Sequence, residues 1–144
     1  MQNKTTVPQK HTVRHAWHFI DAEDKTLGRL ASEVAKLLIG KHKPNFANNI
    51  NVGDNVVITN AEKIFVTGKK LKDKEYEWYT GYPKGLRSEA LGKRLKRSPV
   101  RVVEDAIKGM LPNNKLRKER MGKLYVYAGS EHPHKSQEKN LNKI

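Results

Sequence analysis

Two apolar patterns follow one another near the start of the chain. Trp17–Ala22 is a short aromatic and branched run, which is typical of a strand. Apolar residues then recur from Leu27 to Leu38 at the spacing of one helical face. Thr26 is placed to cap this helix and Gly40 to end it. The pattern predicts a strand followed by an amphipathic helix.

Three further apolar runs predict strands. Val56–Thr59 is continuous, as in a strand buried on both faces, and Ile64–Val66 repeats that signature. Leu124–Tyr127 is the third run and would be the last strand. Strands buried on both faces and separated by an amphipathic helix indicate a parallel sheet covered by helices. The predicted fold class is therefore α/β.

The segment between these strands is more polar. Tyr76–Thr80 is compatible with an extended edge segment or with an irregular arm. Ser88–Lys96 has a basic helical pattern, and Ser98-Pro99 opens a second helix that Pro112 ends. The apolar stripe of this second helix consists of Val103, Ala106, Ile107 and Met110.

One domain accounts for the length of 144 residues. We expect an N-terminal arm over residues 1–16, a single domain over 17–129 and a C-terminal tail over 130–144, because the two ends hold few apolar residues. The predicted core includes Leu30, Val34, Leu38, Val57, Ile58, Phe65 and Ile107.

The net charge of the chain indicates what kind of partner it binds. The chain has 29 Lys and Arg against 15 Asp and Glu, a formal net charge of +14. Residues 1–66 hold 9 of these cations and 6 of the acids, whereas residues 67–144 hold 20 and 9. Such a surface repels itself unless a polyanion neutralises it, and phosphate backbones are the commonest polyanion. Nucleic acid is the leading partner, and a merely soluble basic protein is the alternative.

Several classes of protein are disfavoured by what the sequence lacks. No apolar run approaches the length of a membrane span, and no stretch joins a basic face to a broad apolar one for a membrane surface. Residues 1–10 are polar and lack the apolar core of a signal peptide, so we expect a cytoplasmic protein. The absence of cysteine excludes disulfides, Cys-ligated zinc and thiol catalysis.

Motifs of α/β enzymes are also missing. The Gly-Lys pairs that begin at Gly40, Gly68, Gly92 and Gly122 are never followed by the Ser or Thr of a P-loop. No two glycines are separated by a single residue, which a dinucleotide fingerprint requires. We therefore predict no catalytic residue, no cofactor and no small-molecule substrate.

Metal binding is not predicted either. His132 and His134 form the only dense histidine pair, and they lack further ligands at a useful spacing. Asp54 is interpreted as a turn residue beside Gly53, and the acids at Asp21–Asp24 as part of a strand-to-helix turn.

Basic runs between the predicted elements are the candidate RNA-binding sites. Connections are where a rigid scaffold displays contact residues, and few acids are interspersed here. An aromatic loop between two of the runs could stack on bases, although such rings are more often local core. The candidate RNA-binding residues are Lys41, His42, Lys43, Lys69, Lys70, Lys72, Trp78, Tyr82, Lys84, Arg87, Lys93, Arg94, Lys96, Arg97, Lys115, Arg117, Lys118, Arg120 and Lys123.

Six segments of the chain form a characteristic series, in this order and at about this spacing. They are WHFIDAEDKTLGRLAS (17–32), GKHKPNF (40–46), VGDNVVITNAEKIFVTGKK (52–70), YTGYPKGLR (79–87), IKGMLPNNKL (107–116) and LYVYAGSEHPH (124–134). Together they resemble the bacterial large-subunit ribosomal protein L13 family. The chain departs from the family at Trp17-His18, where Trp-Tyr is usual, and after Pro112, where glycines and a proline are usual.

The resemblance implies a three-layer α/β/α domain with a four-stranded parallel sheet. It also implies a structural role in the large ribosomal subunit, early entry into its assembly, and contacts with large-subunit rRNA and neighbouring ribosomal proteins. A stand-alone RNA-binding regulator of translation is the alternative function.

Overall fold

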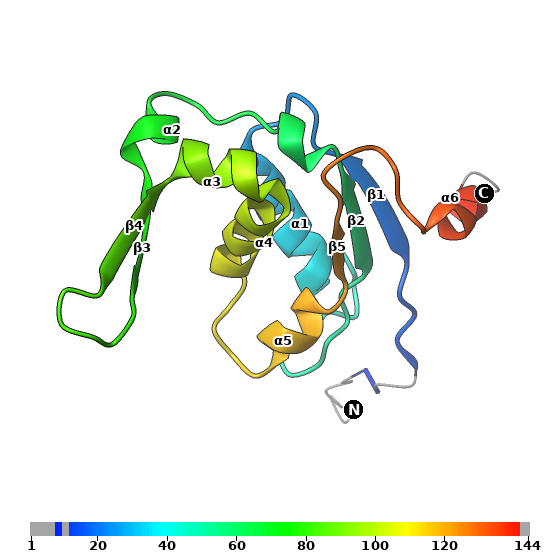
Figure 1. Cartoon of the computed structure of the whole chain (residues 1–144). Coiled ribbons are helices and arrows are strands. Elements are labelled where there is room, and N and C mark those ends of the chain that lie inside the picture. The colour runs from blue at the N-terminus through cyan, green and yellow to red at the C-terminus, as the bar shows by residue number, and fades with distance from the viewer. Residues whose placement is uncertain (1–7, 10–11, 142–144) are drawn as a thin grey trace.

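The computed structural model describes residues 8–9 and 12–141, and every element below belongs to those residues (Figure 1). In chain order the elements are β1 (Trp17–Asp21), α1 (Leu27–Ile39), β2 (Asn55–Thr59), the short 3₁₀ helix η2 (Ala61–Lys63), α2 (Lys70–Asp73), β3 (Glu75–Tyr79), β4 (Leu86–Ala90), α3 (Leu91–Arg97), α4 (Pro99–Met110), α5 (Leu116–Met121), β5 (Leu124–Val126) and α6 (Lys135–Leu141).

The main sheet has three parallel strands in the order β1-β2-β5. Phe19 pairs with Val57, which in turn pairs with Tyr125. Val56 and Ile58 flank Val57 on the central strand, and all three are fully buried. The predicted α/β class with a parallel sheet is confirmed, but the implied fourth parallel strand is wrong.

Ile64–Val66 is the run that fails to form a predicted strand. Its only β contact among the described residues is an isolated bridge between Phe65 and Thr26. β2 already has β1 on one edge and β5 on the other, so no central slot remains for this segment. It pairs instead with the loop after β1, where the Phe65 N–H donates to the carbonyl of Lys25.

One face of the sheet packs against α1 and α4, which lie side by side (Figure 1). The helix stripes face inward as their apolar spacing predicts, and Val56 and Ile58 meet them from the sheet. The buried helical residues of this core include Leu30, Val34 and Leu38 from α1 and Val102, Val103 and Ile107 from α4. Two predictions of burial are wrong: Phe65 is 53% exposed and Met110 48%.

The opposite face of the sheet is lined by aromatic rings. Trp17 stacks on Tyr125 at 5.6 Å between ring centroids, and Phe19 lies 5.5 Å from His132. The Tyr127 hydroxyl is 3.1 Å from Nε2 of His134. The segment expected to be a tail thus packs on the sheet, and it leads into α6 beside β1 (Figure 1).

An antiparallel hairpin, β3–β4, projects from the body of the protein (Figure 1). Tyr76–Thr80 is therefore extended, as one of the two interpretations had it, and β3 pairs along its whole length with β4. The predicted helix over Ser88–Lys96 begins only at Leu91, because Ser88–Ala90 belongs to β4. At the hairpin tip, Gly85 lies so close to Thr80 that a Cβ on it would sit 2.1 Å from the Thr80 hydroxyl oxygen.

Helix α1 ends where the amino end of the sheet begins. Gly40 caps it in the left-handed region at φ +86°, a conformation that suits glycine. Gly53 then passes so close that a Cβ on it would lie 1.8 Å from the Leu38 carbonyl oxygen. This close approach brings Asp54 and the residues after α1 together. Within the described part of the chain, no helix is both long and apolar enough to cross a bilayer.

Candidate nucleic-acid interface

Seven of the predicted RNA-binding cations gather at one end of the molecule, which we call the hairpin end. It consists of α2, the β3–β4 hairpin and α3, and α2 packs against both β4 and α3 (Figure 1). All seven side chains are exposed, and none forms an ion pair with another described residue. They are Lys69, Lys70, Lys72, Lys84, Arg87, Lys93 and Lys96.

Two predicted aromatic contacts also belong to the hairpin end. Trp78 is 47% exposed and Tyr82 is 75% exposed, so neither ring is part of a local core. Trp78 pairs across the hairpin with Arg87, which places an indole and a guanidinium on the same face. The hairpin therefore presents flat rings beside cations.

Two arginines at the base of the hairpin are instead engaged within the protein. Arg94 forms an ion pair with Asp105 and lies 4.2 Å from the centroid of the Tyr76 ring. Arg97 pairs with the buried Glu89 at 2.7 Å. Burial raises the pKa of the Tyr76 phenol under this cover. Arg94 and Arg97 thus fasten the hairpin to α3 and α4.

The predicted basic run before β5 divides in the same way. Lys115 and Lys118 are exposed and make no ion pair with a described residue. Arg117 donates to the Leu111 carbonyl at 3.1 Å and to the Asn113 side chain at 3.2 Å. Arg120 is only 2% exposed, and burial lowers the pKa of its guanidinium. Of the four residues named here, only the two lysines are both exposed and unpaired within the described part of the chain.

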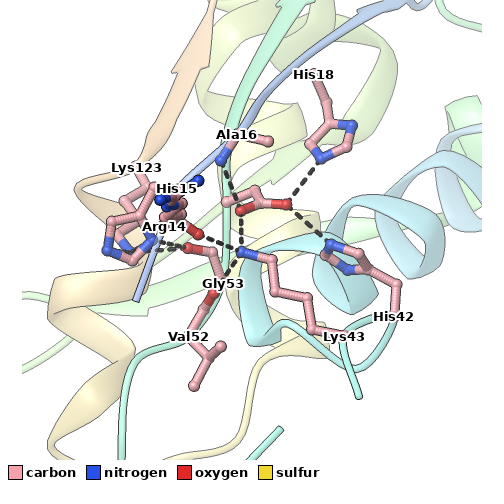
Figure 2. Close-up of polar contacts among 10 residues, drawn as sticks. Arg14, His15, Ala16, His18, His42, Lys43, Val52, Gly53 and Lys123 are labelled. Carbon is pink, nitrogen blue, oxygen red and sulfur yellow. Dashed lines mark hydrogen bonds and ion pairs between the residues drawn. The ribbon is translucent and has the colours of Figure 1, made fainter. Parts of the chain in front are cut away.

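Three other predicted contacts, His42, Lys43 and Lys123, lie around one buried carboxylate at the amino end of the sheet. Asp54 is 1% exposed. Its Oδ2 accepts from Nε2 of His18 at 2.9 Å and from Nε2 of His42 at 2.8 Å (Figure 2). Its Oδ1 accepts from the backbone N–H of Ala16 at 2.9 Å and from the ammonium of Lys43. We call Asp54, His18, His42 and Lys43 the Asp54 cluster.

Backbone carbonyls extend this network on its inner side. Nζ of Lys43 also donates to the carbonyls of Val52 at 3.0 Å and Arg14 at 2.8 Å (Figure 2). Nζ of Lys123 donates to the Gly53 carbonyl at 2.8 Å. Burial, together with the positive charge of Lys43, lowers the pKa of Lys123. Both lysines therefore hold chain segments together through hydrogen bonds to backbone carbonyls.

The Asp54 carboxyl is ionised over a wide range of pH. Burial on its own would raise its pKa, but the hydrogen bonds from Lys43, His18 and the Ala16 N–H outweigh burial and lower the pKa to about 2. The interpretation of Asp54 as a simple turn residue is therefore wrong. It is the anion on which the residues at the start of β1, the segment after α1 and the residues before β2 converge.

The sequence reasoning missed His18 and Asp54 as members of one cluster. His18 lies 36 residues from Asp54 and His42 lies 12 residues from it, so no local motif joins them. The only local signal is an acid placed two residues before the apolar run Val56–Ile58, where its side chain starts close to the core. Lys41, in contrast, stays exposed beside the cluster.

Comparison with known proteins gives a consistent result over most of the chain. Residues 15–133 match the family model described as Ribosomal protein L13. The chain is 52% identical over 135 residues to the large ribosomal subunit protein uL13 of Kocuria rhizophila, covering 94% of this chain and 92% of that protein. It is 53% identical over 135 residues to the protein of the same name from Symbiobacterium thermophilum, covering 94% of each chain.

Proposed function

Because this chain belongs to the ribosomal protein L13 family, we propose that it is a structural constituent of the large ribosomal subunit that binds large-subunit rRNA. Relatives that are about half identical along nearly their whole length carry the name of a large-subunit protein. The family assignment indicates a structural component and not an enzyme. A ribosomal role implies a cytoplasmic protein.

The observation that carries the RNA-binding part of the proposal is the set of unpaired cations at the hairpin end. Their ammonium and guanidinium groups belong to exposed residues, and none of them forms an ion pair within the described part of the chain. A phosphate backbone that meets them releases its own counterions, which drives binding without specific base contacts. The exposed rings of Trp78 and Tyr82 add surfaces on which unpaired bases can stack.

A second, smaller contact is proposed near α5. Lys115 and Lys118 lie at the start of this helix, and Lys41 follows α1, whose residues contact α5. These three lysines are exposed and form no ion pair with a described residue. Contacts at two separate ends of one protein suit a role in holding RNA segments together during early assembly of the subunit.

The proposal also narrows the set of contact residues that the sequence predicts. His42, Lys43, Arg94, Arg97, Arg117, Arg120 and Lys123 all have internal partners or are buried. We assign these seven to the stability of the fold. Neighbouring large-subunit proteins are further partners in the proposal, because exposed Tyr79 and Leu86 give the hairpin an apolar face that phosphates do not satisfy.

Sedimentation tests the function directly. Cell extract is fractionated on a sucrose gradient in low salt without nuclease, and the protein is followed by immunoblotting. We expect it to sediment with the large subunit and with whole ribosomes. A protein that stays with small soluble proteins contradicts the proposal. A sizeable free pool bound to one preferred messenger would favour the stand-alone regulator instead.

A further inference from the structure

Three potential metal ligands converge in the Asp54 cluster from parts of the chain that are far apart in sequence. Nε2 of His18 comes from β1, Nε2 of His42 from the segment after α1, and Oδ2 of Asp54 from the residue before β2 (Figure 2). These three atoms all lie within 4.8 Å of one another. The two imidazoles meet edge to face, with ring centroids 5.7 Å apart.

We propose that His18, His42 and Asp54 bind a divalent transition-metal ion, with Zn²⁺ as the ion that suits them best. Imidazole nitrogens favour Zn²⁺ and its transition-metal neighbours, whereas Mg²⁺ and Ca²⁺ prefer sites made of oxygen alone. Two histidines and one carboxylate form a three-ligand set, which Zn²⁺ completes to a tetrahedron with a water molecule. This inference is independent of the proposed RNA contacts, none of which uses these side chains.

The carboxylate is already oriented for such a role. Its Oδ1 is held by the Ala16 N–H at 2.9 Å and by the Lys43 ammonium, so Oδ2 is turned toward the two histidines. Groups that orient a ligand in this way are a regular part of metal sites and raise metal affinity. Lys43 occupies the oxygen that the metal does not use.

Solvent can reach the side of the cluster where an ion would enter. The His18 and His42 side chains are 33% and 34% exposed, whereas Asp54 is 1% exposed. A metal-bound water therefore has room on the imidazole side. The site is anchored on its carboxylate side and open on its histidine side.

Metal binding changes where the imidazole hydrogens sit. As a hydrogen-bonded cluster, each Nε2 carries a hydrogen that points at Oδ2. To bind the metal, each Nε2 must present a lone pair, so a neutral ring carries its hydrogen on Nδ1 and a protonated ring releases one proton to solvent. The ion then replaces both hydrogen bonds to Oδ2 and ties β1, the segment after α1 and the start of β2 together.

The test titrates the purified full-length protein with Co²⁺ at about pH 7.5, because metal binding displaces protons from its ligands and weakens in acid, and then adds Zn²⁺. We expect one Co²⁺ per chain with the visible absorption of a tetrahedral site, displaced by one equivalent of Zn²⁺. His18→Phe keeps a planar ring but removes one ligand. It should lose the tetrahedral spectrum and weaken binding by at least the roughly 10- to 100-fold that loss of a supporting group costs.

Two further variants make the outcome decisive. His42→Gln removes the other imidazole and should behave as His18→Phe does, and both keep the Asp54–Lys43 ion pair that supports the fold. His132→Gln alters a histidine outside the cluster and should bind as the wild type does. Zn²⁺ should raise the Tm of the wild type and of His132→Gln but not of the two cluster variants.

Three results overturn the proposal. One is the absence of stoichiometric Co²⁺ or Zn²⁺ binding by the wild type. The second is wild-type affinity in His18→Phe and His42→Gln, which would mean that metal binds elsewhere. The third is an equal loss of affinity in His132→Gln. In each case the Asp54 cluster is a hydrogen-bonded structural group only.

Discussion

The hairpin end and the Asp54 cluster both contain lysines from basic runs, but they differ in what surrounds each charged group. At the hairpin end, Lys70 and Lys93 are exposed and form no ion pair with a described residue. In the Asp54 cluster, the Lys43 side chain is 16% exposed and is fixed by a carboxylate and two backbone carbonyls. The same residue type is therefore left exposed at one site and holds chain segments together at the other.

The comparison shows that a basic run is not a uniform binding surface. In Lys41-His42-Lys43, the first lysine is exposed, while the histidine and the second lysine contact Asp54. One buried carboxylate is enough to make this division. The predictions below separate stability from RNA binding and run from the largest expected effect to the smallest.

Asp54→Asn should have the largest effect on the free energy of unfolding. It removes the negative charge but leaves the largely buried Lys43 ammonium without its partner, and breaking a buried pair in this way costs about 3–5 kcal/mol. Urea denaturation of the purified protein measures the loss. Glu77→Gln on the exposed hairpin strand is the control, with a change below about 0.5 kcal/mol. Equal stability in the two variants would show that the Asp54 cluster does not hold the fold.

Lys43→Gln and Lys41→Gln form a matched pair within one basic run. Loss of the Lys43 ammonium removes charge-assisted hydrogen bonds to Asp54, Val52 and Arg14, for an expected cost of about 1.5–3 kcal/mol. Lys41→Gln should change stability by less than about 0.5 kcal/mol, because its side chain is exposed. Thermal unfolding of both variants checks the difference. If Lys41→Gln were as unstable as Lys43→Gln, the assignment of Lys43, and not Lys41, to the stability of the fold would be contradicted.

Acid should weaken the fold through Asp54. The pKa of its carboxyl falls from an ordinary 3.8 to about 2 in the folded protein, so ionised Asp54 stabilises the native state fully only above the ordinary value. This contribution is about 2 kcal/mol, and it is lost as the pH falls from roughly 5 through 2. Urea midpoints across that range should decline in the wild type. A decline of the same size in Asp54→Asn would mean that other carboxyls cause it.

Trp78→Ala should weaken RNA binding without changing the stability of the fold. The indole is 47% exposed, so its removal should leave the unfolding transition nearly unchanged. Loss of one stacked base is worth at least about 1 kcal/mol in binding, or roughly fivefold in affinity for RNA. Incorporation into assembling large subunits, in competition with the wild type, measures this effect. Tyr125→Phe, on the far side of the sheet, is a control that should compete equally.

The sequence predicted those parts of the fold whose signal is local. The helix stripe of α1 and the apolar run of β2 are repeated patterns, and both elements form where expected. Ile64–Val66 carries the same local signal but does not join the sheet, because Phe65 pairs with the loop after β1, at Thr26, and not with a strand. The helix prediction for Ser88–Ala90 is wrong. These residues form a strand by pairing with β3, more than ten positions away, and a local pattern does not show that pairing.

For the candidate site too, the features visible in the local sequence could be predicted and those that depend on tertiary contacts could not. The positions of the cations could be predicted from sequence, since runs such as Lys93-Arg94 and Lys115–Lys123 are visible in the letters. The sequence could not predict which of these cations form ion pairs or hydrogen bonds within the protein, because that depends on residues brought close by the fold. Arg94 forms an ion pair with Asp105 on a neighbouring helix, and Lys43 forms one with Asp54 where two loops come close together.

The most direct test of the account is the salt dependence of assembly for one variant that changes only the hairpin end. In Lys70→Gln/Lys72→Gln/Lys93→Gln/Lys96→Gln, four exposed ammonium groups are lost and the ion pairs of Arg94 and Arg97 remain. The slope of log affinity against log salt should flatten by about 3, at roughly 0.7–0.9 per phosphate contact. The Tm should stay near that of the wild type, because exposed charges contribute little to folding. An unchanged slope with wild-type incorporation would contradict the assignment of RNA binding to the hairpin end.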